Sequence, residues 1–432
     1  MRKEATPGRV ASSFGGARLL EVLVVFARLG CLSFGGPIAH LGYFHAEVVE
    51  RRRWIDDARY ADLVALCQFL PGPASSQVVF ALGMHRAGLL GAFAASFCFT
   101  MPSALLMIAL AYGVAHVDLA QAGWLHGLKI AAVAVVAQAV RAMGTKLCPD
   151  RARISLCVAA AAALLLWSGA LAQLGVIAMG ALLGLVLYRD RESASARPVE
   201  EAARAEPIAK TAAKARTHPA AVLALVSFAA LLVILPPLVV ATRDTEAAGE
   251  VATFDSFYRS GSLVFGGGHV VLPLLRAEVV PNGWLSDDRF LAGYGGAQAL
   301  PGPLFAFAAY LGTAMDPSAA DSMVASTSDP SWARGLLALF AIFLPGWLLI
   351  GGALPFWQRL RARPGARAAL QGANAAVVGV LLAALYDPVF VEAVHGPRDL
   401  VAALVAFVLL EQWKAPPWTV VAASAAAGQW LL

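Results

Sequence analysis

Long apolar segments separated by short polar ones run along almost the whole chain. Residues 154–188, 219–242 and 335–357 carry no charged side chain. Each is at least as long as the roughly 20 residues that an α-helix needs to cross about 30 Å of hydrocarbon. The pattern therefore predicts an all-α polytopic membrane protein.

About thirteen transmembrane helices are expected from this alternation. Their boundaries are set where charged or turn-forming residues interrupt the apolar runs. The expected spans are 19–43, 60–83, 88–115, 123–143, 154–168, 170–188, 218–241, 257–275, 290–313, 333–357, 368–388, 398–413 and 416–432.

Composition agrees with the pattern and excludes several classes of site. Of the 432 residues, 59% are hydrophobic and 14% are charged, against about 25% charged residues in soluble domains. The five cysteines form no CxxC motif and no metal-ligand spacing, so we expect packing residues. We expect no metal, no cofactor, no catalytic residue and no nucleic-acid partner; the lipid bilayer is the main partner, and a homodimer is one arrangement considered.

The distribution of basic residues orients the chain in the membrane. No secretory signal peptide is evident, and the basic tail 1–18 is expected to stay in the cytoplasm. With the N-terminus inside, most Lys and Arg residues fall in inner segments, so the C-terminus is expected outside. One loop conflicts with this assignment, because 45–59 is rich in arginine and yet is assigned to the outside.

A charged, alanine-rich stretch at 189–217 divides the chain, and we expect it to be a cytoplasmic linker. The expected organisation is a tail (1–18), a first repeat (19–188), the linker, and a second repeat (218–432) with one extra leading span.

The two halves share a series of motifs, which indicates an internal duplication. Residues 26–36 match 257–267 at an offset of 231, and 127–135 match 372–380 more weakly. Further matched pairs are Glu47 with Glu278, Trp54 with Trp284, Asp57 with Asp287, Arg59 with Arg289, Gln68 with Gln298, and Pro71-Gly72-Pro73 with Pro301-Gly302-Pro303. Because one extra span precedes the second repeat, we expect the repeats to have inverted topology, an arrangement typical of secondary transporters.

Each half carries a Pro-Gly-Pro inside an apolar run, which predicts interrupted helices facing protein or a watery cavity. Pro73 suits the first turn of a new half-helix. The amides near Ser75 and Ser76 would then be donors at the positive end of a helix dipole, as an oxyanion requires. Gln68 and Gln77 could add neutral hydrogen bonds. A simple proline kink is the alternative.

Two arginines stand inside apolar spans, seven residues before a Gly-Gly pair. Burying Arg28 or Arg259 near the bilayer centre costs at least ~2.5–3.5 kcal/mol, so each should face a cavity or a partner. A guanidinium can bind a tetrahedral oxyanion with two hydrogen bonds. The alternatives are snorkelling or a structural ion pair, for which Glu21 is a candidate partner of Arg28.

The other candidate residues fall into two groups. Glycines beside the interruptions would allow close backbone approach to a substrate, or simply close helix packing. The expected substrate-binding residues are Arg28, Ser33, Gly35, Gly36, Gln68, Pro71, Gly72, Pro73, Ser75, Ser76, Arg259, Gly266, Gly267, Gln298, Pro301, Gly302 and Pro303. Residues considered for gating or coupling, with capping or packing as the alternative, are His40, Glu47, Asp57, Arg59, Lys129, His269, Glu278, Asp287 and Arg289.

Three of these stretches also resemble a known family. LSFGGPIAHLGYF at 32–44, WIDDAR at 54–59 and QFLPGP at 68–73 resemble the long, two-domain form of the chromate ion transporter family. The resemblance implies chromate export across a bacterial inner membrane, and hence chromate resistance. The second half departs from the pattern, with Gly268 in place of Pro37 and Phe305-Ala306-Phe307 in place of Ser75-Ser76-Gln77, which argues against equal roles for the halves.

The sequence leaves the substrate and the energy source of transport open, and it argues against an enzyme. Sulfate or another oxyanion shares the recognition chemistry of chromate. Coupling by protons or by anion exchange is not distinguished, whereas the chain contains no Walker A sequence. A membrane enzyme, such as a reductase or a lipid-headgroup transferase, is disfavoured because flavin, haem, cluster and HExxH motifs are absent.

Overall fold

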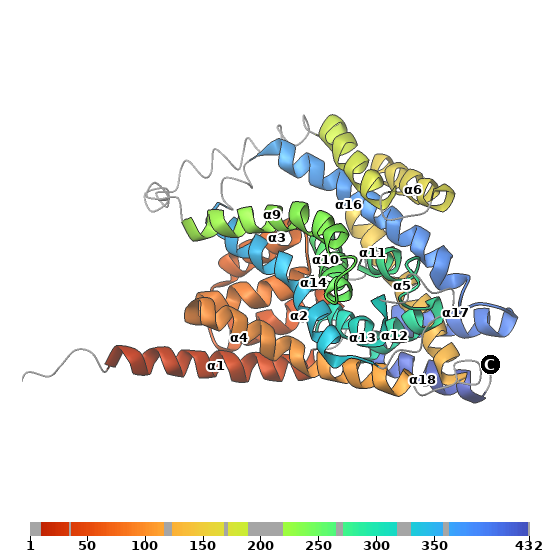
Figure 1. The fold of residues 1–432 in the computed structure, drawn as a ribbon, viewed down its shortest axis with the longest axis horizontal. Helices are drawn as coiled ribbons and strands as arrows, with labels where there is room; N and C mark the ends of the chain where they lie inside the picture. Colours follow the sequence, from red (N-terminus) through yellow and green to blue (C-terminus); the bar gives the residue numbers. More distant parts are fainter. Residues whose placement is uncertain are drawn as a thin grey trace, which may run out of the picture.

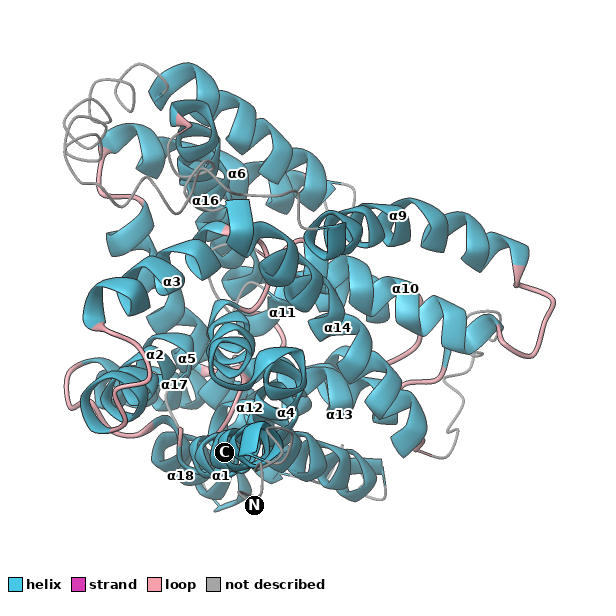
Figure 2. Cartoon of the chain, turned by 90° about the vertical axis from the view of Figure 1, so that its left-hand side faces the viewer, coloured by secondary structure: helices cyan, strands magenta, loops and turns pink. Residues whose placement is uncertain are grey.

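The computed structural model describes residues 10–33, 36–115, 123–167, 172–188, 219–264, 271–317, 330–356 and 363–430. Every regular element within these ranges is a helix, and none of them contains a strand (Figure 2). The protein is therefore a helical membrane protein, as its apolar pattern predicts.

Among the described helices, five segments are long and apolar enough to cross a membrane. They are Ala74–Ala115 (α4), Gly123–Leu147 (α5), Pro219–Ala241 (α9), Trp332–Phe356 (α14 with a 3-10 turn) and Pro364–Phe390 (α16 with a π-helical turn). The expected count of thirteen is thus not confirmed. Four of the expected spans, 19–43, 60–83, 257–275 and 290–313, are instead pairs of shorter helices that fold back on themselves.

The first hairpin consists of α1 (Val10–Leu32) and α2 (Gly36–His45). The rings of Phe26 and Phe44, one from each helix, lie 6.5 Å apart. Helices that continued in one direction would hold these rings roughly 25 Å apart, because an α-helix rises by about 1.5 Å per residue. The chain therefore reverses between them, and Gly36 adopts the φ of +76° that a left-handed turn needs.

The second hairpin consists of α3 (Asp57–Phe69) and the first arm of α4, residues 74–86. Arg86 binds Glu21 at 2.6 Å and lies over the Trp54 ring at 5.4 Å. Both ends of the segment 57–86 thus lie beside the same part of α1, with the Pro-Gly-Pro at the tip between them.

Helix α4 is two antiparallel helices joined by a sharp turn. Ala87 and Gly88 have non-helical backbone angles, and Gly88 has a φ of +68°. On either side of the turn, Phe80 and Phe93 lie 5.4 Å apart. The second arm, residues 88–115, then runs back past α1.

The third and fourth hairpins repeat this arrangement in the second half. In the third, α10 (Ala248–Ser262) and α11 (Val271–Val279) are held by a 2.9 Å ion pair between Arg259 and Glu278. In the fourth, α12 (Asp287–Ala299) lies antiparallel to α13 (Phe307–Ala314), and the Tyr310 hydroxyl donates to the carbonyl of Arg289 at 2.8 Å.

The hairpins enter from opposite ends of the molecule, as the second arm of α4 shows. This arm meets Glu21 of α1 through Arg86 just before its start. Further along, it meets Gly30, then Gly302 through Ser103, and finally Gly296 through Leu110. The first two hairpins thus start at one end, here called the Glu21 end.

The third and fourth hairpins start at the opposite end, here called the Trp284 end. The backbone amide of Asp316, which follows the fourth hairpin, donates to the carbonyl of Trp284 at 3.0 Å. Gly249, at the start of the third hairpin, lies against Pro317.

The remaining helices are exchanged between the halves. Helix α6 (Arg151–Leu166) packs on α16 (Pro364–Ala384), while α17 (Pro397–Glu411) and α18 (Pro417–Trp430) pack on α5 (Figure 1). Backbones touch at both exchanges, because a Cβ on Gly379 of α16 would clash with the carbonyl oxygen of Cys157 in α6, and one on Gly428 would lie 2.6 Å from the Cα of Gly127.

Candidate functional site

The four hairpin tips meet in two pairs through the main chain. The amide of Gly72 donates to the carbonyl of Val264 at 2.7 Å, and the amide of Gly302 donates to the carbonyl of Ser33 at 2.9 Å. Ser33 and Val264 occupy matched positions in the two halves. Each Pro-Gly-Pro is thus bonded to the interruption before the Gly-Gly pair of the other half.

The sequence of the tripeptide explains this contact. The flanking prolines have no amide hydrogen, so glycine supplies the one backbone donor. Gly72 and Gly302 have φ values of +118° and +95°, which L side chains rarely adopt. A Cβ would also lie 2.8 Å from Nε2 of Gln77 at the first site and 2.8 Å from Oγ of Ser103 at the second.

The first-half tip presents backbone donors. The first main-chain bond of α4 runs from the amide of Gln77 to the carbonyl of Pro73 at 2.9 Å. The amides of Ala74, Ser75 and Ser76 precede that bond, so they have no partner within the helix. They form the positive end of the helix dipole, where an anion is stabilised.

Besides Nδ1 of His40, four buried or half-buried polar atoms of the tip segments have no hydrogen-bond partner among the described residues. They are Oγ of Ser33, Oγ of Ser76, Oε1 of Gln77 and Nε2 of Gln298. Leaving such a group unpaired costs about 1–3 kcal/mol. The two serine hydroxyls, Nε2 of Gln298 and the helix amides are neutral donors of the kind an oxyanion requires, whereas Oε1 of Gln77 can only accept a hydrogen bond.

The second-half tip is apolar by contrast. Phe305 and Phe307 replace the serine and glutamine of the first half, and the Phe305 ring lies 5.9 Å from Phe343. Trp347 stacks between Phe343 at 6.0 Å and Phe80 at 6.1 Å. Aromatic rings thus line this side of the tips.

The two membrane arginines have different surroundings. Arg259 bonds Asp255 at 2.8 Å and Glu278 at 2.9 Å, which favours the structural ion-pair interpretation for it. Arg28 is exposed on the α1 face that also presents Leu20 and Leu32, and it forms no ion pair with the described residues. Glu21, considered as its partner, is bonded instead to Arg52, Arg86 and Trp54.

Residues considered for gating lie mainly at the hairpin bases. In the first half, His45 Nε2 lies 2.6 Å from Asp57, and this hydrogen bond raises the pKa of His45. Burial opposes ionisation of Glu47, but its bonds to Arg52 and Arg51 outweigh that effect and lower its pKa. In contrast, the Arg59 side chain is exposed and pairs with Asp56 at 3.3 Å.

The second half has comparable ion pairs at its bases. Asp287 accepts two bonds from Arg276, the shorter at 2.6 Å. Lys129, from the first half, reaches Asp288 at 2.5 Å, so its charge is paired between halves. Arg289 contributes its carbonyl to Tyr310, as described above.

The remaining predicted residues divide into three groups. His40 is buried close to the tips, with Nε2 3.2 Å from the carbonyl of Ser33. Gln68 is exposed, one turn before the tip. Gly35, Gly266, Gly267 and His269 lie outside the described residues.

Sequence reasoning missed two residues beside the tips. Ser103 faces Gly302 from the second arm of α4, and Gly346 occupies the corresponding place against Pro73 in α14 (Trp332–Ala353). Both stand in long apolar runs without a motif. The signal for Ser103 would have been a small polar residue directly after a proline, Pro102, inside a membrane helix.

Comparison with known protein families finds a match in two stretches of the chain. The chromate transporter family matches residues 20–185 and 251–429. A chromate transport protein of Pseudomonas aeruginosa is 28% identical over 413 residues, covering 91% of this chain and 87% of its own. A chromate transport protein of Cupriavidus metallidurans is 26% identical, covering 95% and 92%. No solved structure matches the chain. The matched proteins are transporters rather than enzymes, and the chain belongs to the chromate transporter family.

Proposed function

We propose that this protein is a secondary transporter that exports chromate from the cytoplasm and binds it where the four hairpin tips meet. The observation that carries the proposal is the first-half tip, where three helix amides and the unpaired Ser76 hydroxyl lie at a helix start to which no carboxylate of the described residues is bonded. A tetrahedral dianion accepts hydrogen bonds from such donors, while the helix dipole compensates its charge.

The other predicted binding residues act around this centre. Ser33 and Gln298 offer further unpaired groups from the opposing tips. Aromatic rings at the second-half tip exclude water, which strengthens each polar contact with the anion. Arg28, exposed on α1, attracts the dianion toward the membrane rather than holding it at the tips.

The two halves are inverted repeats in this proposal. The reciprocal bonds of Gly72 and Gly302 support it, as does the entry of hairpins from opposite ends of the molecule. Hairpins whose tips meet near the middle let each half open its own side, which is the geometry of alternating access.

The Glu21 end is the cytoplasmic one in this proposal. Straight spans would put the loop with Arg51, Arg52, Arg53 and Arg59 outside. Because the first two hairpins return to the end at which they start, this loop lies on the cytoplasmic side instead. By the same argument the third and fourth hairpins transfer only two arginines, Arg276 and Arg289, from the cytoplasmic side to the outside. The arginine-rich loop then obeys the positive-inside rule with the N-terminus inside and the C-terminus outside the inner membrane.

Protons or a counter-transported anion drive export in this scheme. A second candidate function is transport of sulfate, because amide and hydroxyl donors recognise the shape and charge shared by tetrahedral dianions. Among the described residues, the donor set at the tips contains no group that would distinguish a chromium from a sulfur centre.

The test is uptake of radiolabelled chromate into everted membrane vesicles that contain the protein. We expect accumulation that responds to an imposed pH or sulfate gradient, and none in vesicles without the protein. Sulfate flux with no chromate accumulation would replace chromate by sulfate as the substrate. Absence of both fluxes would overturn the proposed function.

A further inference from the structure

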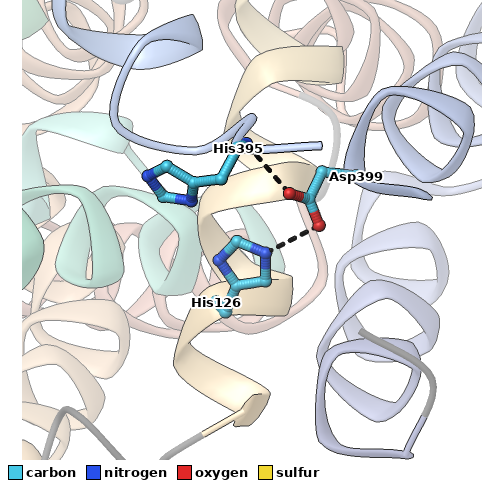
Figure 3. A group of neighbouring side chains, drawn as sticks. All are labelled: His126, His395 and Asp399. Atoms are coloured by element: carbon cyan, nitrogen blue, oxygen red, sulfur yellow. Dashed lines mark hydrogen bonds and ion pairs between the residues drawn. The ribbon is translucent and has the colours of Figure 1, made fainter. Parts of the chain in front are cut away.

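Two histidines and an aspartate meet at the Trp284 end, away from the hairpin tips. His126 belongs to the first turn of α5, His395 precedes α17, and Asp399 lies in the first turn of α17 (Figure 3). A nitrogen from each histidine and an oxygen of the carboxylate all lie within 4.8 Å of one another. The cluster joins the first half to the second.

Asp399 is the fixed part of the cluster. It is 8% exposed, and one oxygen accepts the backbone amides of His395 at 2.9 Å and Gly396 at 3.1 Å. The other oxygen lies 2.9 Å from Nε2 of His126. The helix cap therefore holds one carboxylate oxygen and aims the other at the imidazole.

The second histidine completes a three-sided arrangement. The rings of His126 and His395 are stacked, with centroids 5.8 Å apart and planes inclined by 22° (Figure 3). His395 is exposed, so a solute can enter from the solvent side. A structural ion pair needs only His126 and Asp399. The imidazole of His395 adds a nitrogen that could be a metal ligand and that the ion pair does not use.

We propose that His126, His395 and Asp399 bind a divalent transition-metal ion, with zinc as the best match. Two imidazoles and one carboxylate are the donors that zinc accepts in open tetrahedral sites, with water as the fourth ligand. Bonds of about 2.0–2.2 Å place tetrahedral ligands about 3.3 Å apart. The His126–Asp399 contact is 2.9 Å, and all three ligand atoms lie within 4.8 Å of one another, so the observed spacings span the distance of about 3.3 Å that a metal needs. Small side-chain rotations would bring the three atoms to that spacing.

The ion would join α5 to α17 and so tie the halves together at one end. Because a metal that binds only the folded protein stabilises it by mass action, zinc raises the melting temperature. Magnesium prefers oxygen ligands and octahedral geometry, so it does not compete at this site.

The test is zinc titration of the full-length protein, purified in detergent and treated with EDTA, by calorimetry. We expect one zinc ion per chain and a higher Tm with zinc. His395→Ala should lower the affinity at least about 100-fold, since loss of mere outer-sphere partners already costs about 10–100-fold. His85→Ala, which removes an exposed histidine elsewhere, is the matched control and should bind as the wild type.

His126→Ala and Asp399→Asn provide the second arm. The asparagine keeps an oxygen for the amides of His395 and Gly396, so the metal-free Tm should change little while zinc affinity falls. Zinc binding that is undetectable in the wild type, or equal in the wild type and His395→Ala, would overturn the site. The readout is zinc binding, so its outcome is independent of chromate transport.

Discussion

The two Pro-Gly-Pro tips share a backbone and differ in almost everything attached to it. Each glycine has a positive φ, and each donates its amide to the opposite half. After the tripeptide, the first half continues with Ser75-Ser76-Gln77 and the second with Phe305-Ala306-Phe307. Two of those three first-half side chains keep an unpaired polar atom, whereas the Phe305 ring packs on Phe343 and the Phe307 ring on Phe290.

The hairpin bases differ in a related way. Arg276 and Asp287 of the second half occupy the positions of His45 and Asp57 in the first. The second-half pair has a permanent positive charge, whereas its counterpart titrates. Arg259 is bound by two carboxylates, while its match Arg28 is exposed. At these positions the second half thus has permanent ion pairs, whereas the first has a titratable histidine and an exposed arginine.

The largest expected effect concerns the side of the membrane on which matched loops lie. In a chain without native cysteines, Glu50→Cys should react with a membrane-impermeant thiol reagent from the cytoplasmic side, and Pro281→Cys from the outside. Straight spans at 19–43 and 257–275 would give the reverse labelling. Gln412→Cys and Glu246→Cys are controls, because both interpretations place them inside and outside respectively.

The next effect concerns Arg259 and Arg28. Arg259→Gln should destabilise the fold by on the order of 3 kcal/mol, because it leaves Asp255 and Glu278 unpaired. Arg28→Gln should leave the Tm unchanged and lower chromate transport. Thermal unfolding in detergent and vesicle uptake are the measurements. Equal Tm losses in both variants would show that the arginines have equivalent roles.

A similar loss is expected at the tripeptide glycines. Gly72→Ala and Gly302→Ala should each cost on the order of 2 kcal/mol, from backbone strain and the close contact of the new Cβ. Ser103→Gly should partly rescue Gly302→Ala, because it removes the nearest side-chain atom, but it should not rescue Gly72→Ala. Rescue of both, measured as Tm, would contradict the reciprocal contacts.

Hydroxyl removal at the tip should have a smaller, functional effect. Ser76→Ala should raise the KM for chromate about 10-fold, the loss expected for one hydrogen bond to a charged group. The matched change in the other half, Ala306→Ser, should leave KM within about 2-fold, since its surroundings are apolar. An unchanged KM in Ser76→Ala would restrict recognition to the backbone.

The smallest effect is pH dependence at the hairpin base. The hydrogen bond that His45 donates to Asp57 raises the pKa of His45 above 6.5, so the folded protein favours the charged imidazole. The stability that the pair contributes to the folded protein is therefore fully present below pH 6.5, and it is lost as the pH rises through the folded-state pKa of His45. The pair is largely exposed, so the change in Tm relative to His45→Gln should be about 1 °C. His45→Arg, which introduces the residue found at the matched position Arg276, should keep its stability at high pH. If this variant loses as much Tm at high pH as the wild type, the pH dependence does not come from the His45–Asp57 pair.

Local sequence predicted the helix interruptions but not the path of the chain through them. Proline and glycine break a helix for reasons internal to the backbone, so 33–36, 70–73 and 300–303 could be found from the residues alone. Two half-length apolar helices have together the length and hydropathy of one crossing. Hydropathy therefore cannot distinguish a hairpin from a span, and the arginines of 45–59 were the one sign of an error.

Partners distant in sequence were beyond such reasoning as well. Glu21 was considered for Arg28 because seven residues place both on one helix face, whereas its ligands Arg52 and Arg86 come from other elements. The serine and glutamine positions at the first tip were foreseeable, because a proline start and polar residues in an apolar run imply helix donors. That the polar atoms of Ser76 and Gln77 have no hydrogen-bond partner among the described residues could be learned only from the tertiary structure.

The exchange of helices between the halves has a consequence for synthesis of the protein. When the chain as far as Tyr188 has entered the membrane, α5 has no α18, α6 has no α16, and the tip carbonyl of Ser33 has no Gly302 to bond. The first half must therefore persist as an incomplete assembly until translation reaches the last helix. Fragments ending at the linker should be degraded when made alone and recovered when the second fragment is made in the same cell.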